Sequence, residues 1–144
     1  MLLMFSVFVF VVAVDQGSKA FVASRLQEGT ATLGNVFGMR LRHVVNRRRP
    51  WGSPVGVRVM TIAWLILIAA GCVSASIVHN TAGYIAVGTI MAGATGNLID
   101  GVSRHAVTDF IDLRVWPVFN VADTAIVAGA TIIVWNAARF LWTR

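Results

Sequence analysis

The sequence has few charged residues: Asp, Glu, Lys and Arg together make up 12% of its 144 residues, whereas 57% are hydrophobic. Soluble domains of ordinary composition are about 25% charged. A chain with so little polar surface cannot cover a water-soluble globule, so the composition indicates a membrane protein about the size of one domain. The net charge of +6 then indicates contact with anionic lipid head groups rather than with nucleic acid.

Other absences narrow the chemistry. The single cysteine, Cys72, excludes an intrachain disulfide, and its apolar surroundings predict an inert buried side chain. The three histidines lie in separate segments without metal-ligand spacing, so we expect no zinc site. No P-loop or dinucleotide fingerprint occurs. Ser18 and Lys19 are adjacent, and adjacent helical residues point in different directions, so they are not expected to form a catalytic pair.

Long apolar stretches are abundant, and they predict an all-α membrane protein with four transmembrane helices. The predicted spans of a single integral membrane domain (1–144) are residues 2–24, 55–78, 83–99 and 118–141. The first stretch is expected to be a span rather than a cleaved signal peptide, because no basic residue precedes it. The polar segment 26–54 has short β-type runs and glycines, which predict strands or a small sheet at the membrane surface. Residues 100–116 are expected to form a connecting loop.

The acidic residues are few and concentrated. There are six, Asp15, Glu28, Asp100, Asp109, Asp112 and Asp123, and four of them fall between residues 100 and 123. An Asp at the centre of a span costs about 2.5–3.5 kcal/mol, so an intramembrane acid is a functional candidate. This applies to Asp15 in the first span and to Asp123 in the fourth. Asp100 and Asp112 are expected to be solvated at the level of the head groups.

Asp109 and Asp123 are candidates for a catalytic pair. Pro117 lies between them and cannot sit within a continuous helix, so the two acids belong to elements that can fold back on each other. Two neighbouring carboxyl groups cannot both ionise readily, and the resulting pair of one acid and one carboxylate suits peptide hydrolysis. Asn97 and Asn120 are expected either to orient a carboxylate or a substrate carbonyl, or to pack as ordinary polar residues between helices.

Three blocks of the sequence resemble the motifs of a known family. "DQGSK" (15–19), "AGATGNLID" (92–100) and "VTDFIDLRVWPVFNVADTAI" (107–126) are similar in order and spacing to motifs of lipoprotein signal peptidases, also called signal peptidase II. The resemblance implies a four-helix intramembrane aspartic endopeptidase of the bacterial plasma membrane, with a small extracytoplasmic sheet after the first helix. That family cleaves the signal peptide of diacylglyceryl-modified prolipoproteins just before the lipidated cysteine. No metal or other cofactor is implied.

The resemblance also implies roles for single residues. Asp109 and Asp123 fall on the catalytic dyad of the family, and Asp15 falls on the acid of its first span. Asn97 and Asn120 fall on supporting polar positions.

Two positions depart from the family pattern, and both are associated with substrate contact in the family. The family carries Arg directly after GN-x-x-D, where this chain has Gly101, with Arg104 three residues further on. Asn46 is followed by "RRRPWG" instead of completing the family's N-x-G-A-A-F block. The departures leave open a paralogue with another substrate and a non-catalytic membrane binding protein on the same scaffold. A small transporter that uses the buried acids as a proton relay is a third reading.

The charges and the resemblance indicate opposite orientations. Seven of the twelve Lys and Arg residues lie between Arg25 and Arg58, which by the positive-inside rule would place segment 26–54 in the cytoplasm. The family topology places both termini there and this segment outside, and we expect the family topology. The run Arg47, Arg48 and Arg49 then faces anionic head groups of the outer leaflet or an acidic partner, unless it is a solvated loop.

Overall fold

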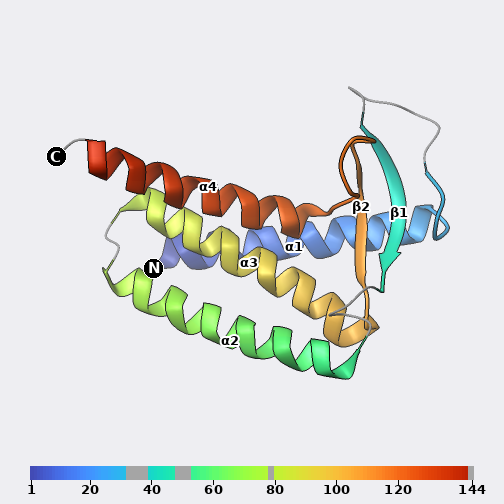
Figure 1. Cartoon of the computed structure of the whole chain (residues 1–144), viewed down its shortest axis with the longest axis horizontal. Helices are drawn as coiled ribbons and strands as arrows, with labels where there is room; N and C mark the ends of the chain where they lie inside the picture. The colour runs from blue at the N-terminus through green and yellow to red at the C-terminus, as the bar shows by residue number, and fades with distance from the viewer. Residues whose placement is uncertain (32–38, 48–52, 78–79, 143–144) are drawn as a thin grey trace.

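The fold was obtained as a computed structural model, which describes residues 1–31, 39–47, 53–77 and 80–142. Its elements, in chain order, are α1 (Leu2–Arg25), β1 (Arg40–Asn46), α2 (Pro54–Ile77), α3 (Thr81–Arg104), β2 (Val107–Asp112) and α4 (Val121–Trp142). The helices run roughly side by side, and the two strands lie across one end of the bundle (Figure 1). Both termini lie at the opposite end, as an even number of spans requires.

α3 is the central helix, because it packs against α1, α2 and α4. Small residues allow this close packing. A side chain at Gly93 would collide with the carbonyl oxygen of Ala122 on α4, and one at Gly129 would collide with the carbonyl oxygen of Ala86 on α3. Gly93 therefore serves the packing of α3 against α4.

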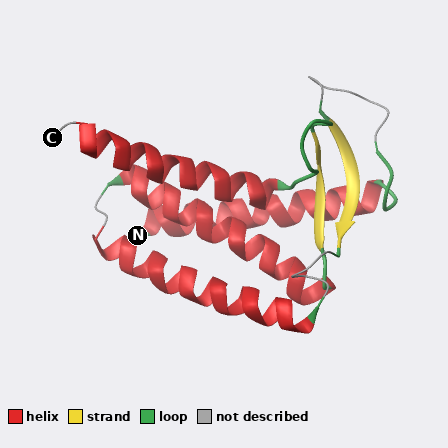
Figure 2. Cartoon of the chain, viewed as in Figure 1, coloured by secondary structure: helices red, strands yellow, loops and turns green. Residues whose placement is uncertain are grey.

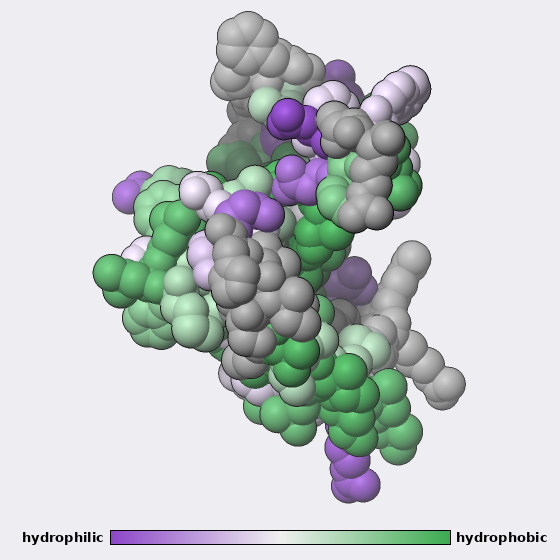
Figure 3. Space-filling model, turned by 90° about the vertical axis from the view of Figure 1, so that its left-hand side faces the viewer, coloured by the Kyte–Doolittle hydropathy of each residue, from purple (hydrophilic) through white to green (hydrophobic). Residues whose placement is uncertain are grey.

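The outer faces of the helices are apolar. Phe10 on α1, Ile66 on α2 and Val134 on α4 are 68%, 64% and 67% exposed. In the part of the chain that is described, four helices are long and apolar enough to cross a membrane. Figure 2 shows how helix dominates the structure, and hydrophobic side chains make up most of the coloured surface in Figure 3. The predicted fold class, four long apolar helices with a small sheet, is confirmed.

The sheet joins two segments that are distant in sequence. β1 and β2 pair antiparallel, with Val44 opposite Asp109 and a change of register between Leu41 and Val44. The prediction of a connecting loop over 100–116 is wrong in its first part: α3 continues to Arg104, and β2 follows directly after it. The sequence of residues 107–112 alone indicates a strand only weakly, because the hydrogen-bonding partner of β2 is β1, the distant strand after the first helix.

The expectation that Asp100 and Asp112 are solvated is also wrong, because both are buried. Oδ2 of Asp112 accepts a hydrogen bond of 2.7 Å from Nε of Arg40 on β1. This contact, together with a backbone hydrogen bond from Arg114, lowers the pKa of Asp112. Asp112 therefore anchors the far end of the sheet.

The side chain of Cys72, and Arg48 and Arg49, lie outside the described residues.

Candidate active site

The start of α4 fixes Asp123 in place. Asn120 precedes the helix, and its Oδ1 accepts a hydrogen bond of 2.9 Å from the backbone N–H of Asp123. In return, Oδ2 of Asp123 accepts one of 3.3 Å from the backbone N–H of Asn120. This reciprocal pair is a capping box, in which the residue before the helix and the third helical residue satisfy each other's backbone donors. The fourth span thus begins after Asn120 rather than at residue 118.

Asp109 lies on β2 and is only 5% exposed. Its Oδ1 accepts a hydrogen bond of 2.8 Å from Nδ2 of Asn120, and its Oδ2 accepts one of 3.2 Å from Nδ2 of Asn46. The chain returns from β2 to the start of α4 through a bridge between Ile111 and Phe119. Both candidate acids therefore contact the same residue, Asn120.

Asn97 on α3 completes the connection between the two acids. Its Nδ2 donates a hydrogen bond of 2.8 Å to Oδ1 of Asp123, and its Oδ1 accepts one of 3.1 Å from Nδ2 of Asn120. A continuous chain of contacts thus runs from Asp109 through Asn120 and Asn97 to Asp123. The structure brings together both acids and both amides that the sequence singled out, from three separate elements.

The surroundings of Asp109 favour its protonated form. Burial raises the pKa of Asp109 to about 6, and the negative charge of Asp123 acts in the same direction. Hydrogen bonds from Asn46 and Asn120 and the positive charge of Lys19 act in the opposite direction. Asp123 is partly exposed, and its two contacts are with donors, as suits a carboxylate. Asp109 therefore holds a proton more readily than a free aspartate does.

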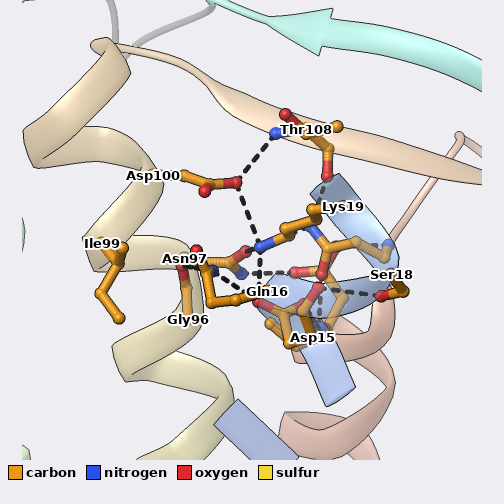
Figure 4. A network of polar contacts seen from close by, with 12 residues as sticks. Asp15, Gln16, Ser18, Lys19, Gly96, Asn97, Ile99, Asp100 and Thr108 are labelled. Carbon is orange, nitrogen blue, oxygen red and sulfur yellow. Dashed lines mark hydrogen bonds and ion pairs between the residues drawn. The ribbon is translucent and has the colours of Figure 1, made fainter. Parts of the chain in front are cut away.

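A second polar cluster, made of Asp15, Lys19 and Asp100, adjoins the network of the two acids. Nζ of Lys19 on α1 is 2.8 Å from Oδ2 of Asp15 and 3.2 Å from Oδ2 of Asp100, and all three side chains are fully buried. Figure 4 shows the Lys19 side chain reaching from α1 toward Asn97 and Asp100 on α3. Nζ also donates a hydrogen bond of 3.2 Å to Oδ1 of Asn97. The cluster is therefore continuous with the network around Asp123.

Asp15 ties three helices together. Its Oδ1 accepts a hydrogen bond of 2.9 Å from the backbone N–H of Ala122, in the first turn of α4. A carboxylate at a helix N-terminus pairs with backbone donors that have no partner within the helix. A side chain at Gly96 on α3 would collide with Oδ2 of Asp15. Gly96 therefore adjoins the polar cluster.

Lys19 and the burial of Asp100 were missed from sequence. Adjacency to Ser18 drew attention to the wrong partner, since Ser18 bonds the Asp15 carbonyl of its own helix. The available signal was the spacing of Asp15 and Lys19, four residues apart on one face of a largely apolar helix.

The two departures from the family motifs have clear locations. Gly101 is buried within α3. Arg104, one helical turn after Asp100, places Nη1 3.4 Å from Oδ1 of that residue. Asn46, at the end of β1, contacts Asp109. In the described part of the chain, no group of three or more His, Cys, Asp or Glu side chains could hold a metal ion.

An apolar cavity of about 400 Å³ lies beside Asp123. It is bounded by the segment before α4 and by the outer face of that helix; the residues are Leu113, Trp116, Phe119, Asp123, Thr124, Val127 and Ala128. Asp123 is the single acidic residue of this lining. The cavity therefore offers an apolar ligand a place next to a carboxylate.

Comparison with known proteins identifies the family. The sequence model of the family described as signal peptidase (SPase) II matches residues 7–139. The lipoprotein signal peptidase of Syntrophomonas wolfei is 38% identical over 135 residues, covering 88% of this chain and 87% of that protein. The lipoprotein signal peptidase of Moorella thermoacetica is 35% identical over 133 residues, covering 88% and 86%.

Solved structures agree with this match. A bacterial membrane enzyme determined by the in meso method at 2.3 Å resolution superposes with a TM-score of 0.82 at 26% identity, over 94% of this chain and 87% of that one. A second, at 1.9 Å resolution, gives 0.75 at 28% identity, over 93% and 91%. The family model matches nearly the whole chain, and the relatives and the four-helix fold agree with it. This chain therefore belongs to the signal peptidase II family.

Proposed function

We propose that Asp109 and Asp123 are the catalytic pair with which this signal peptidase II, a multi-pass aspartic-type endopeptidase, cleaves the signal peptides of lipid-modified prolipoproteins. The observation that carries the proposal is the unbroken set of contacts from Asp109 through Asn120 and Asn97 to Asp123. Such a network holds the two carboxyl groups in a fixed relation to each other, as a pair that divides the acid and base roles requires.

The two acids divide the proton transfers. The Asp123 carboxylate takes a proton from a water molecule, whose oxygen attacks the carbonyl carbon of the scissile peptide bond. Asp109 donates its proton to the carbonyl oxygen, which gives a neutral tetrahedral intermediate. The carbon–nitrogen bond then breaks, the leaving amine takes up the proton held by Asp123, and the hydroxyl proton returns to Asp109. The new carboxyl end and the free amine leave, and no metal is needed in these steps.

The neighbouring residues support this pair. Asn97 and Asn120 hold the carboxyl groups by donating to them, and Asn46 donates to Asp109 from the sheet. Asp15 holds the N-terminus of α4, and thereby Asp123, against α1. The role of Asn46 in this proposal is to orient Asp109, next to the substrate.

The substrate is proposed to reach the pair from within the membrane. The apolar cavity beside Asp123 suits the apolar side chains around the cleavage site of a signal peptide. In the family topology, both termini are cytoplasmic and the sheet end lies at the outer surface of the bacterial plasma membrane. Arg47, paired with Glu28, would then lie at the level of anionic head groups. The chain works as one integral membrane domain.

The test is to replace each acid and follow cleavage. Asp109→Asn and Asp123→Asn are expected to insert normally and to lose cleavage of a peptide that carries a diacylglyceryl-modified cysteine after its signal sequence. Asp112→Asn is the matched control, since Asp112 lies on the same strand, is buried, and pairs with Arg40 instead of the network. Turnover like that of the unchanged enzyme in either acid variant would exclude the pair.

The same variants identify the natural substrate. Membrane proteomes of cells that hold the active enzyme are compared with those of cells that hold Asp123→Asn. Lipoprotein precursors are expected to accumulate only with the variant. Accumulation of other membrane proteins instead would mean that the site, with Gly101 in place of the family's arginine, has been redirected to another substrate.

A further inference from the structure

The buried ammonium group of Lys19 takes no part in the proposed hydrolysis, yet it contacts a residue that holds the catalytic pair. Lysine is almost never fully buried unless it is paired. Its contacts with Asp15 and Asp100 satisfy that requirement. They leave its third contact unexplained, the hydrogen bond of 3.2 Å from Nζ to Oδ1 of Asn97.

This third contact is one of three that fix which way the Asn97 amide faces. Oδ1 of Asn97 accepts from Lys19 and from Nδ2 of Asn120, while Nδ2 of Asn97 donates to Asp123. An ammonium group has three donors and no acceptor. Turning the amide over would set its NH₂ group against two donors and its oxygen against the Asp123 carboxylate. Only one orientation is therefore compatible with all three neighbours.

We propose that Lys19 is a positioning residue of the peptidase, whose ammonium group orients the Asn97 amide so that its nitrogen holds the Asp123 carboxylate in place for catalysis. The inference rests on the proposed function of Asp109 and Asp123. Lys19 touches neither the substrate nor the reacting atoms, and it acts through Asn97. The distances support this order of action, since Asn97 contacts both Lys19 and Asp123 directly.

The charge of Lys19 reaches the other acid as well. It lowers the pKa of Asp109, whereas burial and the charge of Asp123 raise it. The charged groups that contact the ammonium group itself are Asp15 on α1 and Asp100 on α3. Removing Lys19 is therefore expected to raise the pKa of Asp109 and to move the pH dependence of kcat/KM toward higher pH.

The test must separate two effects of removing Lys19: the loss of its contact with Asn97, and the loss of the positive charge that pairs with the buried carboxylates. Lys19→Met alone would leave two buried carboxylates beside one another, which is strongly destabilising. We therefore combine it with Asp15→Asn and use the Asp15→Asn single variant as the reference. In this double variant the cluster keeps one negative and one positive group, Asp100 and Arg104, whose Oδ1 and Nη1 atoms are 3.4 Å apart. Melting temperature in detergent, kcat and the pH profile are measured with a diacylglyceryl-modified signal peptide.

The expected result is a folded double variant whose kcat is about 10–100-fold below that of the reference, because a small misplacement of a catalytic group has effects of this size. The same Lys19→Met change is then made on an Asn97→Ala background. If Lys19 acts through Asn97, Lys19→Met is expected to lower kcat less than about threefold on this background, because the effects of the two substitutions are then not additive. Ser18→Ala, on the same helix, is the control and is expected to keep full kcat.

The outcomes are decisive in either direction. A folded double variant with the kcat of the reference overturns the inference, and so does a Lys19 effect that is equally large without Asn97. Failure of the double variant to fold, despite its balanced charges, would assign Lys19 to the fold alone and also overturns it. Activity in Asp109→Asn or Asp123→Asn would instead overturn the proposed function, so the two failures are distinguishable.

Discussion

Nδ2 of Asn120 donates a hydrogen bond of 2.8 Å to Oδ1 of Asp109, eleven residues earlier in the chain, while Oδ1 of the same amide caps α4. One side chain thus serves both the helix that carries one acid and the strand that carries the other. An amide can do this because it has an acceptor at one end and two donors at the other. The start of α4 and the position of Asp109 are therefore coupled.

The two tasks of Asn120 are expected to be separable by substitution. Asn120→Ala removes the cap, which costs about 1 kcal/mol of stability, and also removes the contact with Asp109. Asn120→Ser keeps a capping oxygen, but its shorter side chain loses the donor that reaches Asp109. We expect the serine variant to melt close to the unchanged enzyme in detergent, and both variants to lose most of their kcat. A serine variant with full kcat would show that the cap alone matters.

Asp109→Asn is expected to stabilise the fold while it abolishes cleavage. The folded-state pKa of Asp109 is raised from 3.8 to about 6, so ionisation of this group above pH 6 disfavours the folded state by up to about 3 kcal/mol. Asparagine carries no such penalty. The gain in stability should be largest above pH 6 and should vanish below about pH 4, where Asp109 is protonated in both the folded and unfolded states.

Urea or thermal unfolding of both proteins across this pH range would check the difference. The difference in stability between the two proteins at low pH serves as the internal control. It reports the effect of the substitution that does not depend on the ionisation of Asp109. A difference that grows as the pH falls would contradict the assigned direction of the Asp109 shift.

The pH dependence of cleavage follows from the same group. If Asp109 supplies the proton, the active form of the free enzyme is the one in which Asp109 is still protonated. Because its pKa is raised to about 6, kcat/KM is expected to be high below that pH and to fall above it, with apparent constants that belong to the pair. A kcat/KM that rises through this range would assign the acid role to another group.

Gly96→Ala tests the contact between α3 and the polar cluster. The added methyl group would collide with Oδ2 of Asp15, which also binds Lys19. We expect a loss of about 1–3 kcal/mol of stability, because overpacking displaces well-packed neighbours. Gly17→Ala is the matched control, since nothing lies within 4 Å of its added methyl group and alanine favours a helix. Equal melting temperatures for the two variants would show that Asp15 can move aside freely.

Local patterns in the sequence carried much of the fold. Four apolar runs predicted four long helices, because a run of about 20 apolar residues is what a membrane span requires. Pro117 correctly separated Asp109 from Asp123, since proline cannot continue a helix. The limits of α3 were less accessible: its last turn is polar, and β2 begins three residues after Arg104. Sequence reasoning took this polarity for a loop.

The sequence by itself determined which side chains could carry the chemistry, and the capping box of Asn120 and Asp123 is local enough to be read from four consecutive residues. Only the tertiary structure decided that Lys19, Asp100 and Asn97 meet. Lys19 and Asn97 are 78 residues apart, and their contact depends on how α1 and α3 are rotated and packed against each other. Small residues such as Gly96 set that packing, so burial and pairing of these charges follow from the assembled bundle rather than from any one helix.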